Sequence, residues 1–402
     1  MIALTDVQFA HREIRDRIIR TPTLWSEFFS NACGAEVFLK LENLQRTGSF
    51  KIRGATYKIG KSAAQIGTSG IVAASAGNHA QGVALAARNY GLAATIVMPE
   101  NASLSKQLAT RGYGGKVVLH GASVAEALRH AQALAEEGGF FIHPFDDEDV
   151  MAGQGTVGLE IVEELGTVDE VWVPVGGGGL IAGIAVAVKE TLPGARIVGV
   201  QAAVCPSALE ARRRGAPCSV AASETIADGI AITRVGDRPF PVIEKYVDEL
   251  VTVDEDGIAL AMLHLLERKK LLAEGAGAVC LAALLAAGEK VRGKRVALVV
   301  SGGNVDMNLL DRILERGLIR TGRILRFAVV LRDAPGSLAS LLTELSSERA
   351  NILHISHDRL RDDLAVWSTR VEIEMETRSA THGDHILRML HAKGFSVERS
   401  VG

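Results

Sequence analysis

Short runs rich in valine and isoleucine alternate with stretches of helical spacing over much of this chain. The first set begins at residue 71 and reads I-V-A-A, T-I-V-M-P, K-V-V-L-H and F-F-I-H-P, with helix-forming segments between the runs. Strands that alternate with helices favour a parallel sheet, because each helix returns the chain to the edge where the previous strand began. The pattern therefore predicts a doubly wound α/β lobe.

A second, longer alternation follows residue 148. It contains V-W-V-P-V, a run of glycines, R-I-V-G-V and R-V-A-L-V-V. We interpret the two sets as two lobes of one domain over residues 1–320, with a small lobe over about 51–148 and a large lobe over about 1–50 and 149–320. Ligands bind beyond the carboxyl ends of strands in such sheets, so polar motifs that follow the strands are expected to share one cleft.

Residues 324–402 show a different pattern and predict a separate domain. After the linker-like G-L-I-R-T-G, strand-like and helix-like segments follow in the order β-α-β-β-α-β, which is that of a ferredoxin-like α+β fold. In the third of these strands, Val371, Ile373 and Met375 alternate with glutamates, which is the period of a strand with one buried face.

Charge balance and cysteine spacing narrow the class of protein. With 44 basic and 47 acidic residues the net charge is −3, which gives no basis for binding nucleic acid or a membrane surface and favours an enzyme for small molecules. The four cysteines form no C-x-x-C pair, so we expect reduced thiols. Because the N-terminus lacks a secretory signal pattern and no apolar run could span a bilayer, we expect a cytoplasmic protein.

One lysine has neighbours that favour a chemical role. Lys51 follows Phe50 in the segment R-T-G-S-F-K-I-R-G and has Arg46 and Arg53 nearby. A lysine becomes a good nucleophile toward an aldehyde when its neutral form is favoured, and both an apolar neighbour and nearby positive charge lower a lysine pKa. Lys51 is therefore a candidate Schiff-base lysine. The alternative is an ordinary solvated lysine.

Four consecutive glycines stand between an expected strand and an expected helix, at Gly176, Gly177, Gly178 and Gly179. Backbone N–H groups at such a helix start can converge on an anion, and a phosphate is the expected guest. The rival interpretation is a dinucleotide-binding fold, because the run also fits G-x-G-x-x-A. That fold needs an acidic residue at the end of the next strand, where this chain has Gln201, so the missing carboxylate argues against NAD.

Four motifs occur in order along the chain: S-F-K-I-R-G at 49–54, S-A-G-N-H-A-Q-G at 75–82, V-G-G-G-G-L-I-A-G at 175–183 and S-G-G-N at 301–304. Together they resemble the pyridoxal-phosphate enzymes of the tryptophan-synthase β-like fold, also called fold type II, and most closely the threonine dehydratases. The resemblance implies that residues 1–320 form the catalytic domain. The C-terminal segment resembles an ACT domain through its topology and the turn D-A-P-G-S-L, the alternative being a ferredoxin-like domain that only dimerises.

The resemblance also implies roles for single residues. Lys51 would hold pyridoxal 5'-phosphate and, once released by the substrate, remove the α-proton. The residues that it assigns to the cofactor are Phe50, Lys51, Asn78, Gly176, Gly177, Gly178, Gly179, Leu180, Glu274 and Ser301. The residues that it assigns to the carboxylate of an amino-acid substrate are Ser75, Ala76, Asn78 and His79. The alternatives are a structural hydrogen bond for His79 and a helix-capping carboxylate for Glu274.

The residue expected at the pyridine nitrogen favours elimination. Ser301 would face that nitrogen, and because a neutral hydroxyl stabilises a pyridinium less than a carboxylate does, a long-lived carbanion is not favoured. Expulsion of a β-leaving group then suits the site better than transamination. Serine racemases of this fold carry a second serine where this chain has Ala76, and they bind a divalent metal at positions that match Gln201, Cys205 and Ser207, so we expect one acid/base face and no metal site.

The resemblance implies a threonine ammonia-lyase that converts L-threonine to 2-oxobutanoate and ammonia, as in isoleucine biosynthesis, and L-serine to pyruvate. The alternatives are a β-replacement enzyme of the cysteine-synthase type, a hydroxyaspartate ammonia-lyase and, in a different class, a catalytically silent amino-acid sensor, against which the intact Lys51 and Ser301 speak. The ACT-like segment implies isoleucine or valine as an effector. The chain has one copy of this segment, which fits effector sites formed between subunits, so we expect a homo-oligomer, either a dimer or a tetramer.

Overall fold

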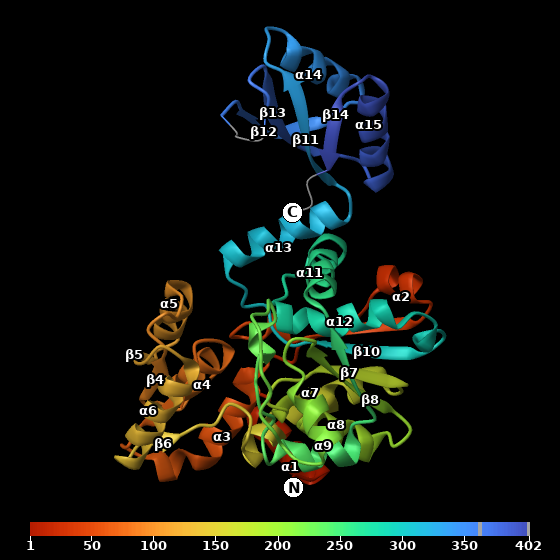
Figure 1. The fold of residues 1–402 in the computed structure, drawn as a ribbon. Helices are drawn as coiled ribbons and strands as arrows, with labels where there is room; N and C mark the ends of the chain where they lie inside the picture. The colour runs from red at the N-terminus through yellow and green to blue at the C-terminus, as the bar shows by residue number, and fades with distance from the viewer. Residues whose placement is uncertain (361–363, 400–402) are drawn as a thin grey trace. The chain divides into compact units, whose positions relative to one another are not determined.

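The chain forms two units in the computed structural model, which describes residues 1–360 and 364–399. The units are Met1–Met307 and Asn308–Gly402 (Figure 1). We predicted a boundary at residues 320–324, whereas this division groups most of helix α13 (Met307–Arg320) with the second unit.

A six-stranded sheet with the order β1-β2-β10-β7-β8-β9 forms the large lobe of the first unit. Its strands are β1 (Thr23–Trp25), β2 (Glu36–Leu41), β7 (Glu170–Pro174), β8 (Arg196–Ala202), β9 (Glu249–Val253) and β10 (Arg295–Val300). Neighbouring strands run parallel except β1 and β2. Strand β7, one of the two middle strands, is buried at every position, which explains why its sequence is apolar after Glu170.

Helices cover this sheet. They are α1 (Leu4–Ile14), α2 (Glu27–Cys33), α7 (Glu148–Leu165), α8 (Gly179–Thr191), α9 (Ser207–Arg214), α10 (Pro239–Tyr246), α11 (Glu255–His264) and α12 (Gly275–Ala287), with the short turns η1 (Glu42–Leu44), η2 (Asp228–Ile230), η3 (Leu265–Lys269) and η4 (Gly288–Val291). Helices α7 and α8 approach so closely that a Cβ atom on Gly183 would lie 2.2 Å from the carbonyl oxygen of Met151. Only glycine permits this contact. No helix within residues 1–360 and 364–399 is long and apolar enough to cross a membrane.

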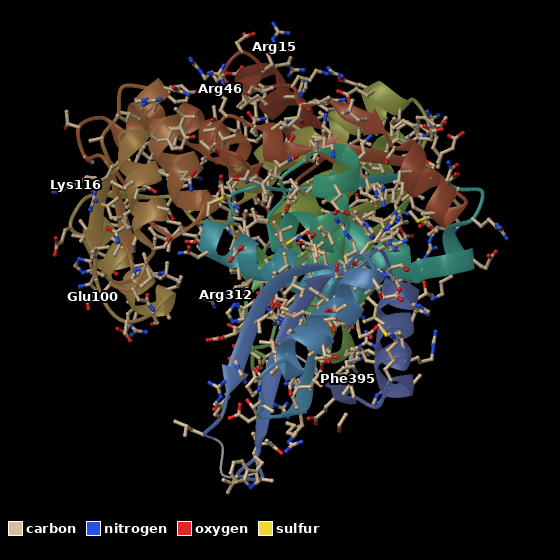
Figure 2. All side chains as sticks on the ribbon, turned by 90° about the horizontal axis from the view of Figure 1, so that it is seen from above. Arg15, Arg46, Glu100, Lys116, Arg312 and Phe395 are labelled. Carbon is tan, nitrogen blue, oxygen red and sulfur yellow. The ribbon has the colours of Figure 1, made fainter. Side chains whose placement is uncertain are left out.

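The small lobe is a second doubly wound unit, as predicted, and appears in orange and yellow in Figure 1. Its parallel sheet has the order β5-β4-β3-β6. The strands are β3 (Ile71–Ala74), β4 (Ala94–Met98), β5 (Lys116–Leu119) and β6 (Phe140–Phe141), and the helices are α3 (Lys51–Ile66), α4 (Asn78–Asn89), α5 (Leu104–Gly112) and α6 (Val124–Glu136). Exposed Glu100 and Lys116 lie at its outer edge (Figure 2).

The second unit contains an antiparallel sheet with the order β12-β13-β11-β14. Its elements after α13 are β11 (Ile324–Arg332), α14 (Ser337–Ser347), β12 (Asn351–Asp358), β13 (Ser368–Glu376), α15 (Ala380–Ala392) and β14 (Ser396–Arg399). This is the predicted ferredoxin-like order, although residues 361–363 and 400–402 of the predicted range lie outside the described residues. Val371, Ile373 and Met375 are buried in its core, as their alternation with glutamates predicted.

Candidate active site

A cavity of about 340 Å³ lies in the first unit, between its two lobes. This volume is in the range of small-molecule sites. Loops at the carboxyl ends of β3, β7 and β10 contribute to its lining, which is where a parallel sheet places its ligands. The structure brings every residue assigned above to cofactor or substrate to this cavity, namely Phe50, Lys51, Ser75, Ala76, Asn78, His79, Gly176, Gly177, Gly178, Gly179, Leu180, Glu274 and Ser301.

Lys51 is the first residue of α3, and its amine lies inside the cavity. The amine donates a hydrogen bond of 2.8 Å to the carbonyl oxygen of Pro144 and lies 5.2 Å from the centre of the Phe50 ring. Burial lowers the pKa of Lys51 to about 8, against the negative charge of Glu274, which raises it.

The expectation that nearby arginines lower this pKa was wrong, because burial is the cause. Arg46 is exposed, and Arg53 is fully buried in contact with carboxylates instead.

The glycine run connects β7 to α8. Gly178 has a positive φ of 93°, and a Cβ atom at Gly177 would lie 2.3 Å from the Phe145 ring. A side chain therefore fits at neither position. The first N–H groups of α8 have no partner within the helix, and the helix dipole makes this end partly positive, so it suits an anion.

The loop after β3 holds the second motif. Ser75 Oγ accepts a hydrogen bond of 3.1 Å from the backbone N–H of Gly77, which tightens the loop before α4 begins at Asn78. His79 is buried, and its Nε2–H donates to the carbonyl oxygen of Ile142 at 3.0 Å. Burial and the charge of Lys51 lower the pKa of His79 to about 3, so its ring is neutral. This geometry is that of a structural hydrogen bond.

Three polar side chains from distant segments form a chain beside the cavity. Asn304 Nδ2 donates to Asn78 Oδ1 at 2.7 Å, and Asn78 Nδ2 donates to Glu274 Oε1 at 2.7 Å. Burial and the charge of Asp228 raise the pKa of Glu274 to about 7. Although Glu274 stands at the N-cap of α12, its side chain does not cap that helix, so the helix-capping interpretation was wrong.

Ser301 follows the last residue of β10 and contacts the segment that carries Lys51. Its carbonyl oxygen accepts a hydrogen bond from the Phe50 N–H at 3.1 Å, and Ser49 forms an isolated β-bridge with Gly302. The Ser301 hydroxyl is buried and donates to the carbonyl oxygen of Ala276 at 3.3 Å, which is a long hydrogen bond for a hydroxyl.

Two of the three positions matched to a racemase metal site, Gln201 and Ser207, form hydrogen bonds within the protein. Gln201 Nε2 donates to the carbonyl oxygen of Val175 at 3.2 Å and to Ser207 Oγ at 3.4 Å. Its Oε1 accepts from two backbone N–H groups at the start of α9, each at 3.0 Å. In the part of the chain that the structure describes, no group of three or more His, Cys, Asp or Glu side chains could hold a metal ion.

Sequence reasoning missed residues that come from loops far apart in the chain. Phe145 lies against the glycine run, and residues 228–232 form part of the cavity wall. Lys106 in α5 and Asp228 in η2 form an ion pair of 2.8 Å beside the cavity, joining the two lobes. No spacing in the sequence indicates this pair, because 122 positions separate its members.

The chain is similar to known enzymes over all or most of its length. A family model described as "Pyridoxal-phosphate dependent enzyme" matches residues 14–302. An L-threonine ammonia-lyase from Thermotoga maritima is 47% identical over 403 residues, covering 100% of both chains. Among solved structures, the processed form of threonine deaminase isoform 2 from Solanum lycopersicum is 36% identical with a TM-score of 0.75, covering 78% of this chain and 92% of that one. Maize serine racemase is 33% identical with a TM-score of 0.74, covering 79% and 98%.

Proposed function

The chain belongs to the pyridoxal-phosphate dependent enzymes, and from this premise we propose that it converts L-threonine to 2-oxobutanoate and ammonia and L-serine to pyruvate and ammonia. The observation that carries the proposal is that Lys51 and the glycine run line one cavity, in a chain similar over its full length to an L-threonine ammonia-lyase.

The residues at the cavity fit the cofactor. The N–H groups at the start of α8 would hold its phosphate, and the amine of Lys51 would bind its aldehyde carbon. Phe50 would pack on the ring, the Asn78 amide would bind the 3'-oxygen and Ser301 would face the ring nitrogen. The bound cofactor supplies an electron sink for negative charge at the substrate α-carbon.

Different residues at the cavity would bind the substrate and remove its α-proton. The Ser75–His79 loop would hold the substrate carboxylate through its hydroxyl and N–H groups. Lys51 would take the α-proton, for which a pKa of about 8 is well placed near neutral pH. Because Ser301 is neutral and Ala76 carries no acid or base, the site favours loss of the β-hydroxyl over transamination or racemisation.

The proposal is tested by changing Lys51 to alanine. We expect Lys51→Ala to lose both the visible absorbance of the reconstituted protein and the formation of 2-oxobutanoate from threonine. Lys61→Ala is the matched control, because Lys61 lies in the same helix with an exposed amine. A yellow, active Lys51→Ala variant would contradict the assignment, and a panel with serine, 3-hydroxyaspartate and O-acetylserine plus sulfide would define the substrate.

We also propose that the second unit binds an amino-acid effector, isoleucine or valine. A groove of about 390 Å³ is lined by the D-A-P-G-S-L turn and by His357, Arg359 and Thr369. The turn leads into α14, whose first N–H groups suit a carboxylate. Calorimetry on the full chain should show heat of binding for one of the two amino acids and a shift in threonine turnover. Heat for neither would remove this proposal.

We further propose a homo-oligomer, a dimer or a tetramer, in the cytoplasm. Free Cys33, Cys205, Cys218 and Cys280 suit a reducing compartment. Sedimentation of the full chain should give a mass of two or four copies, and a single-copy mass would contradict it.

A further inference from the structure

Among the described residues, Arg53 is the largest side chain that is fully buried, and the proposed reaction gives it no role. It lies in the first turn of α3, two residues after Lys51. Its Nε and Nη2 donate to the two oxygens of Glu42 at 2.8 Å each, and its Nη1 and Nη2 donate to the two oxygens of Glu160 at 2.7 and 2.8 Å. Nη1 also donates to Thr156 Oγ1 at 3.0 Å.

The buried cations of this cluster are paired with carboxylates. Lys40 is also fully buried and lies 2.8 Å from Glu160 and 3.4 Å from Glu164, so Lys40 and Arg53 each face two carboxylates and share Glu160. Burial alone would lower the pKa of Arg53, but the charges of Glu42 and Glu160 raise it above its usual value. A buried charge is costly unless it is paired and hydrogen-bonded, and the planar fork of arginine satisfies both carboxylates as a lysine could not.

The ion pairs of Arg53 connect the two lobes close to Lys51. Glu42 follows β2 and Glu160 lies in α7, both in the large lobe, whereas Arg53 lies in α3 of the small lobe. The backbones also touch, since a Cβ atom on Gly153 of α7 would lie 2.6 Å from Gly54 Cα. The first turn of α3 is therefore fixed to α7.

Lys51 depends on this turn for its position. Its amine donates to the carbonyl oxygen of Pro144, and that hydrogen bond must break when the amine reacts. From then on the backbone of the first turn decides where the amine can reach. Effective reaction requires the reacting atoms to be held close to the productive geometry.

We propose that Arg53 is a positioning residue whose buried guanidinium fixes the first turn of α3 to the large lobe and so holds the Lys51 amine beside the glycine run and Ser301. This inference rests on the proposed function.

The test is Arg53→Lys in the holoenzyme, because lysine keeps the positive charge but cannot form the paired hydrogen bonds of the guanidinium group to Glu42 and Glu160. We expect the visible circular dichroism of the bound cofactor to weaken and kcat for threonine to fall by about 100-fold. KM should change by less than about twofold, because the carboxylate loop is untouched. The matched control is Glu170→Gln, which breaks another buried cluster, with Trp172, Arg196 and Lys294, at the start of β7. It should lower stability and leave the visible dichroism and kcat unchanged.

Wild-type dichroism and kcat in Arg53→Lys would overturn the proposal, as would equal losses in Glu170→Gln. If Arg53→Lys does not fold, Thr156→Val carries the test, because it removes one acceptor of Arg53 and keeps the shape. A smaller loss of both signals supports the proposal, and no loss overturns it. The visible dichroism reports the bound cofactor and does not require turnover of substrate. If the wild-type protein binds cofactor but does not convert threonine, the proposed function fails, while the dichroism still tests the role of Arg53.

Discussion

Lys51, His79 and Glu274 line one cavity, and burial moves their pKa values in different directions. Burial disfavours charge, so it lowers the pKa of the lysine and the histidine and raises that of the carboxyl group. The result is a base near neutral pH, a neutral imidazole and a carboxyl group that holds its proton to about pH 7.

Cofactor uptake should follow the titration of Lys51. Only the neutral amine attacks an aldehyde, so uptake by cofactor-free protein should rise about tenfold from pH 7 to pH 9, with a midpoint near the pKa of about 8. Glu274→Gln removes a negative charge that raises this pKa, so the midpoint should move to lower pH. Stopped-flow absorbance measures the rate, and a midpoint moved upward would contradict the assignment.

Glu274 should also affect stability. Its folded pKa of about 7 lies above its ordinary value of 4.5, so its contribution to stability is fully present below about pH 4.5 and is lost as pH rises through 7. The loss is on the order of 3 kcal/mol. Urea unfolding of cofactor-free protein at several pH values should show this loss in the wild type and not in Glu274→Gln. The same change at exposed Glu100 should leave the loss intact.

The sequence indicated which residues line the cavity, but it did not indicate how deeply they are buried or which side chains they contact. The motifs indicated Lys51 and Ser301 through their resemblance to pyridoxal-phosphate enzymes, and both residues line the cavity. The pKa of Lys51 was predicted to be low for a partly wrong reason, since Arg53 is paired with carboxylates from segments that no local pattern connects to it. The contact of Glu274 with Asn78 spans 196 positions and has no sequence signal.

At the scale of elements, glycines decide how α7 and α8 pack. Gly183→Ala would place a Cβ atom 2.2 Å from the Met151 carbonyl oxygen, in a contact between backbones that cannot rotate away. We expect destabilisation of about 1–3 kcal/mol or more. Gly194→Ala is the control, because nothing lies within 4 Å of its added Cβ. Denaturant midpoints compare the two, and equal midpoints would contradict this account of the packing.

Alternation of strands and helices predicted the parallel pairing of the small-lobe sheet and of the large-lobe sheet apart from β1, because the spacing of apolar residues and the length of each element are local properties. The pairing of β2 with β10 could not be predicted in this way, since Glu36 is in register with Arg295 and nothing near either residue specifies the other. The antiparallel edge strand β1 was missed for the same reason.

At the scale of the whole first unit, the Lys106–Asp228 ion pair connects the lobes beside the cavity. Lys106→Met and Asp228→Asn should each raise KM for threonine by a few-fold, because the pair restrains the lobes around the substrate. The effects of the two single variants on KM should not add in the double variant, since both remove the same ion pair, although Asp228→Asn also removes a charge that raises the pKa of Glu274. Steady-state kinetics of the three variants test this, and additive effects would show that the two side chains act separately.

The β-bridge between Ser49 and Gly302 has a consequence for how the protein is made. A nascent chain emerges from the ribosome with its Lys51 segment early and its S-G-G-N segment about 250 residues later, so the small lobe can fold during synthesis while Ser49 still lacks its bridge partner Gly302. A polypeptide whose translation stops before residue 302 should be unable to retain the coenzyme, and the ability to bind it should appear only after Gly302 has been added.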